Sequence, residues 1–257
     1  MSDTRPSPAA GPASPVKGTL ALTAMELRLT LRRGENLLAT IIVPAVVLLF
    51  FATVGILPAI AGKPVDFLLP GSIALGVIAT SMVSLGIATG YERSYGVLKR
   101  LGGSPLPRAG MIGAKILSVI VVEAFQVVLL VGIAVTLLDW RVPAGASLPV
   151  MIASVLLGSL TFGGLGLLMA GRLRAEATLA LANGLFLAFL LLGGIIIPID
   201  HLPSGLAAVA QVLPANPLTE ALRIALGGPG DPGGPLATLL GWGVVSAGLA
   251  TATFRWE

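Results

Sequence analysis

Residues that could do chemistry are few in this sequence, and their spacing matches no catalytic motif. The chain has one histidine, His201, which follows Asp200. It has no Gly-x-x-x-x-Gly-Lys-[Ser/Thr] loop that would hold ATP phosphates and no His-Glu-x-x-His metal motif. It has no cysteine, which excludes thiolate metal sites and disulfides. No base lies beside a serine in an apolar stretch, which disfavours an intramembrane hydrolase. We therefore expect no catalytic site, metal or cofactor.

One carboxylate lies well inside an apolar stretch: Glu123, in SVIVVEAFQVVLL. Gln126 follows about one helical turn later on the same face. An ionisable residue at membrane depth is costly and usually faces a protein interior or a cavity. Glu123 and Gln126 are therefore candidates for a translocation pathway. The alternative is a polar contact that fixes helix packing, with Lys115, two turns earlier, drawing the carboxylate toward the headgroups.

Composition places these residues in a membrane protein. The chain has 257 residues, of which 55% are hydrophobic and 11% charged, whereas a soluble domain has about 25% charged residues. The mean hydropathy is +0.96 and the pI is about 10.0. The basic residues are scattered between apolar stretches, with no basic face interleaved with aromatics, which disfavours nucleic-acid binding. Arg, Ala, Gly, Leu and Val are frequent, which suggests a GC-rich bacterial genome.

Six apolar stretches approach the ~20 residues that a helix needs to cross a bilayer. We place the spans near residues 37–60, 67–90, 112–138, 148–170, 178–199 and 236–254. The expected fold class is an all-α integral membrane protein with six transmembrane helices, which form a domain over residues 36–257.

Segments outside the spans have their own patterns. Residues 1–16 are rich in Pro, Ala and Ser, and we expect them to be a disordered tail. Residues 17–35 alternate apolar and basic positions at helical spacing, which predicts an amphipathic helix at the membrane surface or a helical lead-in to the first span. Residues 200–235 contain apolar helical stretches too short to span, which predicts short outer helices before the last span. The alternative is an ordinary outer loop with one helix.

Orientation follows from the basic residues, which concentrate in cytoplasmic segments of membrane proteins. With the N-terminus inside, only three of the sixteen Lys and Arg residues fall outside: Lys63, Arg141 and Arg223. We therefore expect a multi-pass protein of the bacterial plasma membrane with both termini in the cytoplasm.

A polar segment, YERSYGVLKRLGGSPLPR at residues 91–108, separates the second and third spans on the cytoplasmic side. Its 91–101 part can form a short helix, and GGSPLP ends it. Apolar residues fall in helical register within it: Tyr91, Tyr95, Val97, Leu98 and Leu101. This mixture of apolar and basic residues suits a protein partner or lipid headgroups. The simplest alternative is a basic loop that only sets the topology.

The second span has a small residue at every fourth position. The stripe consists of Ser72, Gly76, Thr80, Ser84 and Ala88. Small residues let two membrane helices approach closely. The stripe predicts close helix packing within the chain, and the alternatives are a dimer surface or a pathway surface.

These features together resemble the permease subunits of type-2 ABC exporters, over about residues 17–257. The segment after the second span resembles that family's signature: a Glu-Arg pair, Gly-x-Leu-Lys-Arg-Leu and a Ser-Pro-Leu break. The outer stretch LPANPLTEALRIALGG resembles the family's sequence before the last span. The nearest subgroup is the drug-resistance permeases of daunorubicin-exporter type.

The resemblance implies a coupling helix that docks into a separate ATPase subunit. The implied docking residues are Tyr91, Glu92, Arg93, Gly96, Leu98, Lys99, Arg100 and Leu101. Where the family often has a second acid, this chain has Ser94 and Tyr95, so individual ion pairs do not carry over. Residues 17–33 resemble the family's connecting helix, and residues 204–228 resemble outer helices that cap the exit.

The function implied is transport without an ATP site in this chain. Two permeases, identical or not, would work with two ATPase subunits to export an amphiphilic drug, a lipid or a glycan-linked lipid. The alternative is a non-transporting scaffold or assembly factor whose basic loop binds anionic lipid, at about 1 kcal/mol per nearby Lys or Arg.

Overall fold

The structure is a computed structural model that describes residues 14–32, 34–54, 63–102 and 108–254. Throughout these residues the regular structure is helical, with no β-strand. In chain order the elements are α1 (Pro15–Arg32), α2 (Gly34–Val54), α3 (Pro64–Ile78), the π-helix η1 (Ala79–Ser84), α4 (Leu85–Ser94), α5 (Val97–Gly102), α6 (Arg108–Leu137), α7 (Leu148–Arg172), α8 (Ala175–Leu192), the 3-10 turn η2 (Ile199–His201), α9 (Ser204–Val212), α10 (Ala215–Ala225) and α11 (Gly233–Thr253).

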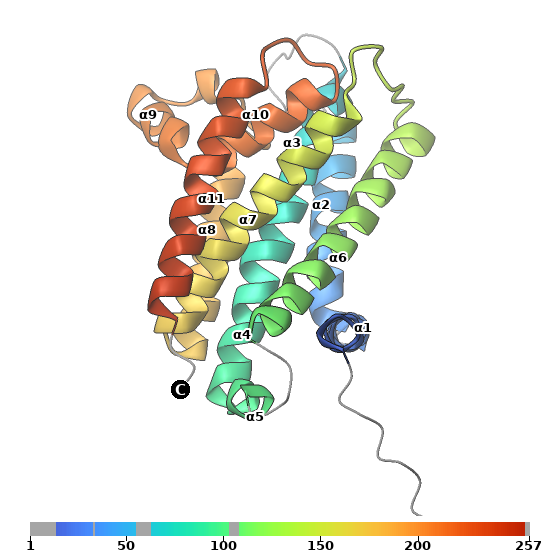
Figure 1. The fold of residues 1–257 in the computed structure, drawn as a ribbon. Coiled ribbons are helices and arrows are strands. Elements are labelled where there is room, and N and C mark those ends of the chain that lie inside the picture. The colour runs from blue at the N-terminus through green and yellow to red at the C-terminus, as the bar shows by residue number, and fades with distance from the viewer. Residues whose placement is uncertain (1–13, 33, 55–62, 103–107, 255–257) are drawn as a thin grey trace, which may run out of the picture.

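The long helices form one bundle, as Figure 1 shows. Five helices of the described chain are long and apolar enough to cross a membrane: the continuous α3–η1–α4 helix, α6 from Gly113 onward, α7, α8 and α11. In α2, the described apolar part is the shorter stretch Thr40–Val54. The all-α fold and the multi-pass membrane class are thus confirmed, while the count of six spans stays a prediction.

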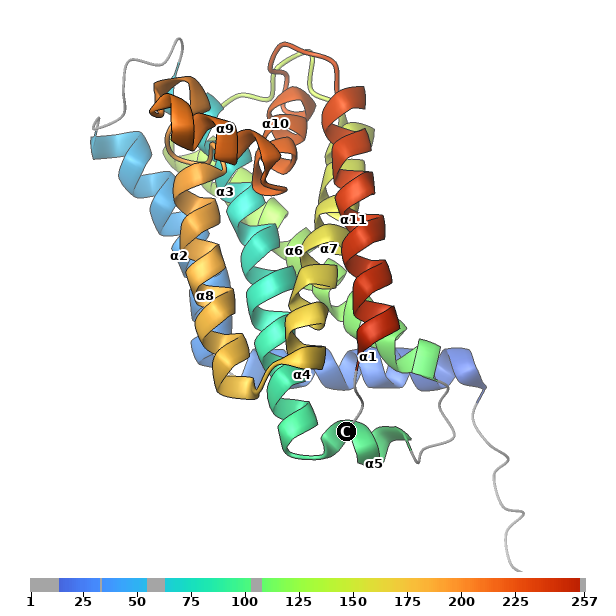
Figure 2. The same cartoon turned by 90° about the vertical axis from the view of Figure 1, so that its left-hand side faces the viewer.

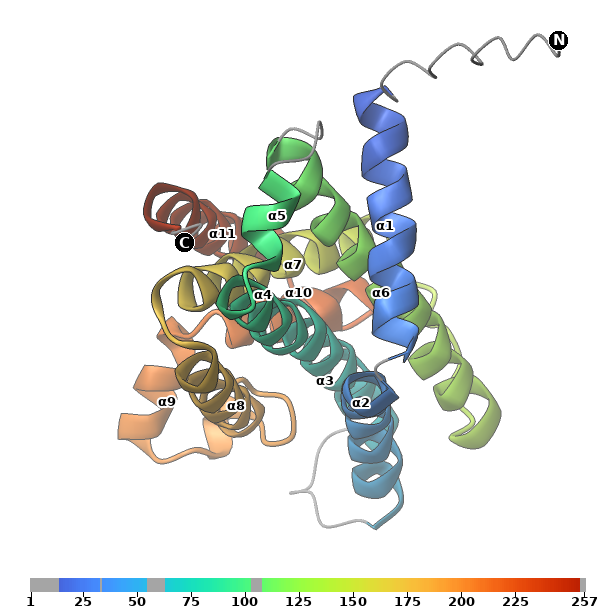
Figure 3. The same cartoon turned by 90° about the horizontal axis from the view of Figure 1, so that it is seen from below.

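The α3–η1–α4 helix is the centre of the bundle. In its apolar window 89% of the residues are buried, against 22% in α8 and in α11. It contacts α2, α6, α7 and α8, which surround it when the bundle is seen from its lower end (Figure 3). Whatever holds or moves this helix therefore acts on the whole bundle.

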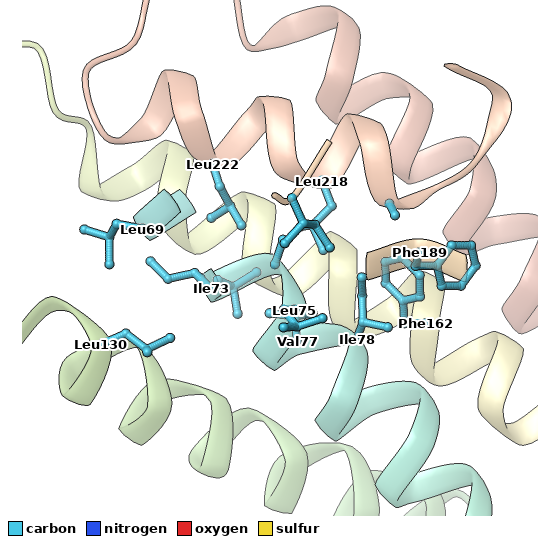
Figure 4. Close-up of a cluster of buried hydrophobic side chains, with 14 of the residues drawn as sticks. Leu69, Ile73, Leu75, Val77, Ile78, Leu130, Phe162, Phe189, Leu218 and Leu222 are labelled. Atoms are coloured by element: carbon cyan, nitrogen blue, oxygen red, sulfur yellow. The ribbon is translucent and has the colours of Figure 1, made fainter. Parts of the chain in front are cut away.

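A buried apolar cluster joins α10 to the central helix (Figure 4). Leu218 and Leu222 of α10 are fully buried in the same cluster as Ile73 of α3. Phe162 of α7 and Phe189 of α8 meet edge to face at a centroid distance of 5.5 Å. The short helix α10 is therefore part of the folded core and not a loose surface segment.

The two ends of the bundle differ, as Figure 2 shows. Helix α1 lies across one end, and α5 lies at that same end; α9 and α10 lie at the other. The expected helix over residues 17–35 corresponds to α1, which begins at Pro15, and α2 begins at Gly34. The predicted disorder of residues 1–16 was thus wrong for Pro15 and Val16, and residues 1–13 lie outside the described chain.

The predicted single helix over residues 91–101 was wrong. Helix α4 continues to Ser94, and α5 starts at Val97. Gly96 separates them with φ +67°, a left-handed conformation that glycine adopts without strain. The tyrosines before the break, Tyr91 and Tyr95, stack at a centroid distance of 6.0 Å.

The predicted stripe of small residues is interrupted by η1. Gly76 lies close enough to α6 that a Cβ atom there would sit 3.2 Å from the Gln126 side chain. A π-helix has one residue more per turn than an α-helix, so it shifts the faces that follow it. Ser84, the last residue of η1, and Ala88, in α4, are partly exposed. Beyond η1 it is Gly86, and not a residue of the stripe, that lies close to a neighbouring helix, at the backbone of Gly166 in α7.

The contact between η1 and α7 yields a stability prediction. A Cβ atom at Gly166 would lie 2.7 Å from the carbonyl oxygen of Met82 and 3.1 Å from its Cα. We expect Gly166→Ala to force the two backbones apart and to cost about 1–3 kcal/mol, as overpacking does. The measurement is the thermal unfolding midpoint of the purified protein in detergent.

The matched control is Gly184→Ala on α8. No atom lies within 4 Å of a Cβ built at Gly184. There the substitution should raise the midpoint slightly, because alanine favours a helix over glycine by up to about 1 kcal/mol. Equal midpoints for the two variants would refute the close backbone contact.

Candidate functional site

The bundle end that holds α5 contains a partly buried ionic cluster. The ammonium of Lys115, on α6, lies 2.6 Å from Glu92 Oε2 and 2.9 Å from Glu26 Oε1. The three side chains are only 10–16% exposed. Because Glu26 belongs to α1 and Glu92 to α4, one ammonium ties three helices together. A lysine has three N–H donors, and two of them are used here.

The neighbouring Arg93 ties the end of α4 to α7. Its guanidinium donates to the carbonyl oxygen of Gly171 at 2.6 Å and to that of Leu173. Carbonyls at a helix C-terminus lack partners within the helix, and cations are favoured there. Glu92 and Arg93 were predicted to belong to the docking surface, but the structure places both side chains in contacts within the chain.

Of the remaining predicted docking residues, Tyr91 lies on α4, Gly96 lies just before α5, and the others lie on α5. Lys99 and Arg100 are exposed, and the Arg100 amide donates to the Gly96 carbonyl oxygen at 3.2 Å. Leu98 and Leu101 fall within α5, and their side chains lie outside the described part of the structure. The docking role of these residues stays a prediction.

The predicted pathway residue Glu123 is fully buried. Its carboxylate accepts hydrogen bonds from the hydroxyls of Ser81, in η1, and Ser159, in α7. Lys115 binds Glu26 and Glu92 instead, so the structure does not show the pull of Lys115 on Glu123 that the packing alternative included. In this conformation Glu123 connects three helices inside one chain and does not face an open passage.

Gln126 extends this polar layer to α2. Its Nε2 atom donates to the carbonyl oxygen of Thr40, and its Oε1 atom accepts from Thr80 at 3.0 Å. Thr80 and Ser81 are consecutive residues of η1, and both reach α6. π-Helical segments are rare and often lie at functional sites. Here η1 presents two adjacent polar side chains to one neighbouring helix.

At the opposite end, Arg223 of α10 holds the outer helices. Its guanidinium donates to the carbonyl oxygen of Gly194 and lies 4.0 Å from the centroid of the Phe67 ring. Burial lowers the pKa of this guanidinium from its usual value, and the nearby Glu220 carboxylate opposes that shift. The residue thereby fixes α10 to α3 and to the turn after α8.

The described residues contain no group of three or more His, Asp or Glu side chains that could hold a metal ion. His201 is exposed, and its Nδ1 atom lies 3.2 Å from Asp200 Oδ1. The structure thus brings no catalytic set together around His201.

Sequence reasoning missed the ionic cluster and the contacts of Arg93. Glu26 and Lys115 are 89 residues apart, so their pairing leaves no trace in local spacing. Lys115 could have indicated such a contact, because an ionisable side chain within an apolar helix usually pairs with another polar group.

A comparison with protein-family models gives a match to "ABC-2 type transporter" over residues 17–226. The chain belongs to the ABC-2 type transporter family. It is also 28% identical over 146 residues to a protein of Bacillus subtilis (strain 168) named "Putative transport permease YvfS". That match spans 54% of this chain and 56% of the relative, so it reaches little more than half of the relative's length.

Family membership and the apolar helices make this chain a multi-pass membrane protein of the ABC-2 type transporter family. The family resemblance is thereby confirmed, while export and the permease role stay predictions. The drug-resistance subgroup also stays a prediction.

The buried carboxylate of Glu123 yields a second stability prediction. Glu123→Leu leaves the Ser81 hydroxyl without its acceptor, while the Ser159 hydroxyl can still donate to the Val155 carbonyl oxygen at 2.7 Å. An unpartnered buried hydroxyl costs about 1–3 kcal/mol, so the unfolding midpoint in detergent should fall. Glu123→Gln keeps an acceptor oxygen and should lose less.

A combined variant separates lost hydrogen bonds from lost packing. Adding Ser81→Ala and Ser159→Ala to Glu123→Leu removes all members of the hydrogen-bonded set, which is often close to neutral. The triple variant should therefore unfold at a higher temperature than Glu123→Leu alone. A triple variant that is less stable than the single one would contradict the assigned contacts.

Proposed function

We propose that this chain is the membrane permease of an ABC exporter and that it is driven by a separate ATPase subunit. Two permeases, identical or of two kinds, would combine with two ATPase subunits in a bacterial plasma membrane. The proposal includes six membrane-spanning helices, with α2 as the first.

The observation that carries the proposal is the placement of α5. This short helix lies at the end of the bundle and carries the exposed Lys99 and Arg100. It follows the central helix after a single glycine turn at Gly96. A partner that binds α5 would therefore act on the most buried helix of the permease. Because the sequence has no ATP-binding loop of its own, we assign the source of free energy to that partner.

The ionic cluster gives a route by which movement at α5 would spread. Glu92 is in the last turn of α4, and Lys115 joins it to α6 and, through Glu26, to α1. Removing one partner of a buried ion pair is strongly destabilising, by about 3–5 kcal/mol. We therefore expect α1, α4 and the start of α6 to move together when the ATPase pulls on α5.

The arrangement of the ends supports a cytoplasmic position for α1, α5 and the end of α11, which lie together (Figure 2). Apolar side chains of α1 also face away from the bundle: Leu20 is 55% and Met25 is 53% exposed. That suits a helix lying in the inner membrane surface. On this orientation α9 and α10 cover the outer end, where a substrate would leave.

We further propose an amphiphilic substrate, namely a drug, a lipid or a glycan-linked lipid. The support is the resemblance of the chain to the drug-resistance permeases of daunorubicin-exporter type. Translocation would involve Glu123 and Gln126 only if transport opens the helices that enclose them.

The first experiment is co-purification in mild detergent from the native host. We expect an ATP-binding subunit to accompany the intact chain and to be lost when Leu98→Asp and Leu101→Asp are combined. The physical reason is that charged side chains cannot enter an apolar groove without a large desolvation cost. The matched control combines Leu206→Asp and Val209→Asp on α9, at the opposite end, where both side chains are about half exposed.

The same experiment tests the scaffold alternative. Absence of any ATPase from the intact chain, with or without nucleotide, would overturn the exporter proposal. Binding to anionic vesicles that is abolished by salt but survives scrambling of residues 91–101 would then favour a lipid-binding scaffold.

A further variant separates docking from coupling. Lys115→Met should leave the ATPase bound, because Lys115 is not on α5. It should lower ATP hydrolysis by the reconstituted complex, because Glu26 and Glu92 then lie close together without their cation. Combining it with Glu26→Gln and Glu92→Gln removes that repulsion and should restore stability but not coupling. Unchanged hydrolysis in Lys115→Met would refute the proposed route.

A further inference from the structure

A cavity of about 530 Å³ lies against α7, with α6 on one side and α11 on the other. This volume falls within the range of about 300–1,000 Å³ found for small-molecule sites. Its lining is almost wholly apolar and includes Met111 and Ile120 of α6, Leu157 and Leu167 of α7, and Phe254 after α11. An apolar site of this size suits a hydrocarbon group.

The cavity opens on the side of the bundle. Three of its lining residues are large apolar side chains that are well exposed: Ile116 at 42%, Leu156 at 43% and Leu160 at 38%. They belong to membrane-spanning helices, so the opening faces the hydrocarbon of the membrane. An occupant can therefore enter from the bilayer without crossing water.

The length of the cavity is close to the thickness of the hydrocarbon region of one bilayer leaflet. From Met111 to Ile120, α6 rises about 14 Å at 1.5 Å per residue, and half of a bilayer core is about 15 Å. Met111 lies near the start of α6, and Phe254 lies just beyond the end of α11. Both therefore lie near the end of the bundle that holds α5, and the cavity extends from that end toward the middle.

One polar group in the cavity has no partner. Thr89 of α4 lines the cavity, is 1% exposed, and its hydroxyl makes no hydrogen bond. Buried hydroxyls in folded proteins are normally paired. Thr89 lies one turn before Glu92, at the polar end of the cavity. Its hydroxyl is therefore available to an acceptor at the depth where the ester groups of a phospholipid lie.

The charged side chains beside the cavity do not favour a particular phospholipid headgroup. Lys115 lines the same end of the cavity, but its ammonium already binds Glu26 and Glu92. This cluster carries two negative charges and one positive charge, so it offers no excess cation to a phosphate. Recognition would then rest on the hydrocarbon chain and on one hydrogen bond to an ester carbonyl.

We propose that this cavity binds one acyl chain of a phospholipid from the cytoplasmic leaflet, with an ester oxygen accepting a hydrogen bond from Thr89. The lipid is a resident component of each chain and is distinct from the exported substrate. The proposal needs neither an ATPase nor transport, so its test is independent of the proposed function.

The test uses the full chain, purified in detergent and stripped of lipid. The protein is then mixed with phosphatidylglycerol whose acyl chains are deuterated, and bound lipid is counted by native mass spectrometry. We expect one tightly held lipid per chain. Phosphatidylethanolamine should bind with similar affinity, because the headgroup is not the recognised part.

Two variants locate the site. Ala247→Phe on α11 adds a ring to the cavity lining and should abolish the tightly held lipid. Thr89→Val keeps the shape of the side chain and removes only the hydroxyl. It should weaken binding about fivefold, the usual effect of one neutral hydrogen bond. The matched control is Ala252→Phe, on an exposed position of the same helix outside the cavity lining, which should retain the lipid.

Two results would overturn the proposal. Equal lipid counts in the intact chain, Ala247→Phe and Thr89→Val would show that no lipid occupies the cavity. An unchanged lipid count together with conversion of a dimer to a monomer by Ala247→Phe would assign the cavity to contact with a second copy. If Ala247→Phe does not fold, Thr89→Val decides, since it changes no volume in the packed helices.

Discussion

The arrangement of this bundle depends on one ammonium with two carboxylate partners. Lys115 enters the bundle near the start of a membrane span, where a free cation would be costly. It is stable there because α1 supplies Glu26 and α4 supplies Glu92. This requirement fixes α1, the end of the central helix and α6 in one relative position. The position of α5, which follows α4 directly, is thereby also fixed.

Away from this cluster, the helices are held by close backbone approach and by a few buried hydrogen bonds. In lipid the hydrophobic effect does little to join one apolar helix to another, so packing of small residues and polar contacts must do so. Gly86 and Gly166 bring α4 against α7. Ser246 of α11 donates to the Thr161 carbonyl oxygen, and Thr161 donates to that of Leu239, each at 3.0 Å. The apolar surfaces that remain are free to face lipid.

The membrane spans could be predicted because length and hydropathy alone specify a helix that crosses a bilayer. The features that position the site could not. The small residues at every fourth position did not indicate η1, because a π-helix changes the register of the helix faces without changing the amino-acid composition. The break at Gly96 was missed because the flanking residues fit one helical face. The partners of Lys115 and Arg93 come from distant helices, and local periodicity contains no information on such pairs.

These contacts change the interpretation of Glu92 and Arg93, the pair at the start of the polar segment. In sequence it resembled a surface that a partner would bind, but both side chains bind within the chain. Their role is then to hold the end of α4, so that α5 projects at a fixed angle. A force on α5 would act on α4. Contacts with α6 and α1 hold α4 on one side, and contacts with α7 hold it on the other. Tilting α4 alone would separate Glu92 from Lys115, or Arg93 from the Gly171 and Leu173 carbonyl oxygens. Concerted movement of these helices keeps every ion pair and hydrogen bond of Glu92 and Arg93, and it therefore costs less free energy.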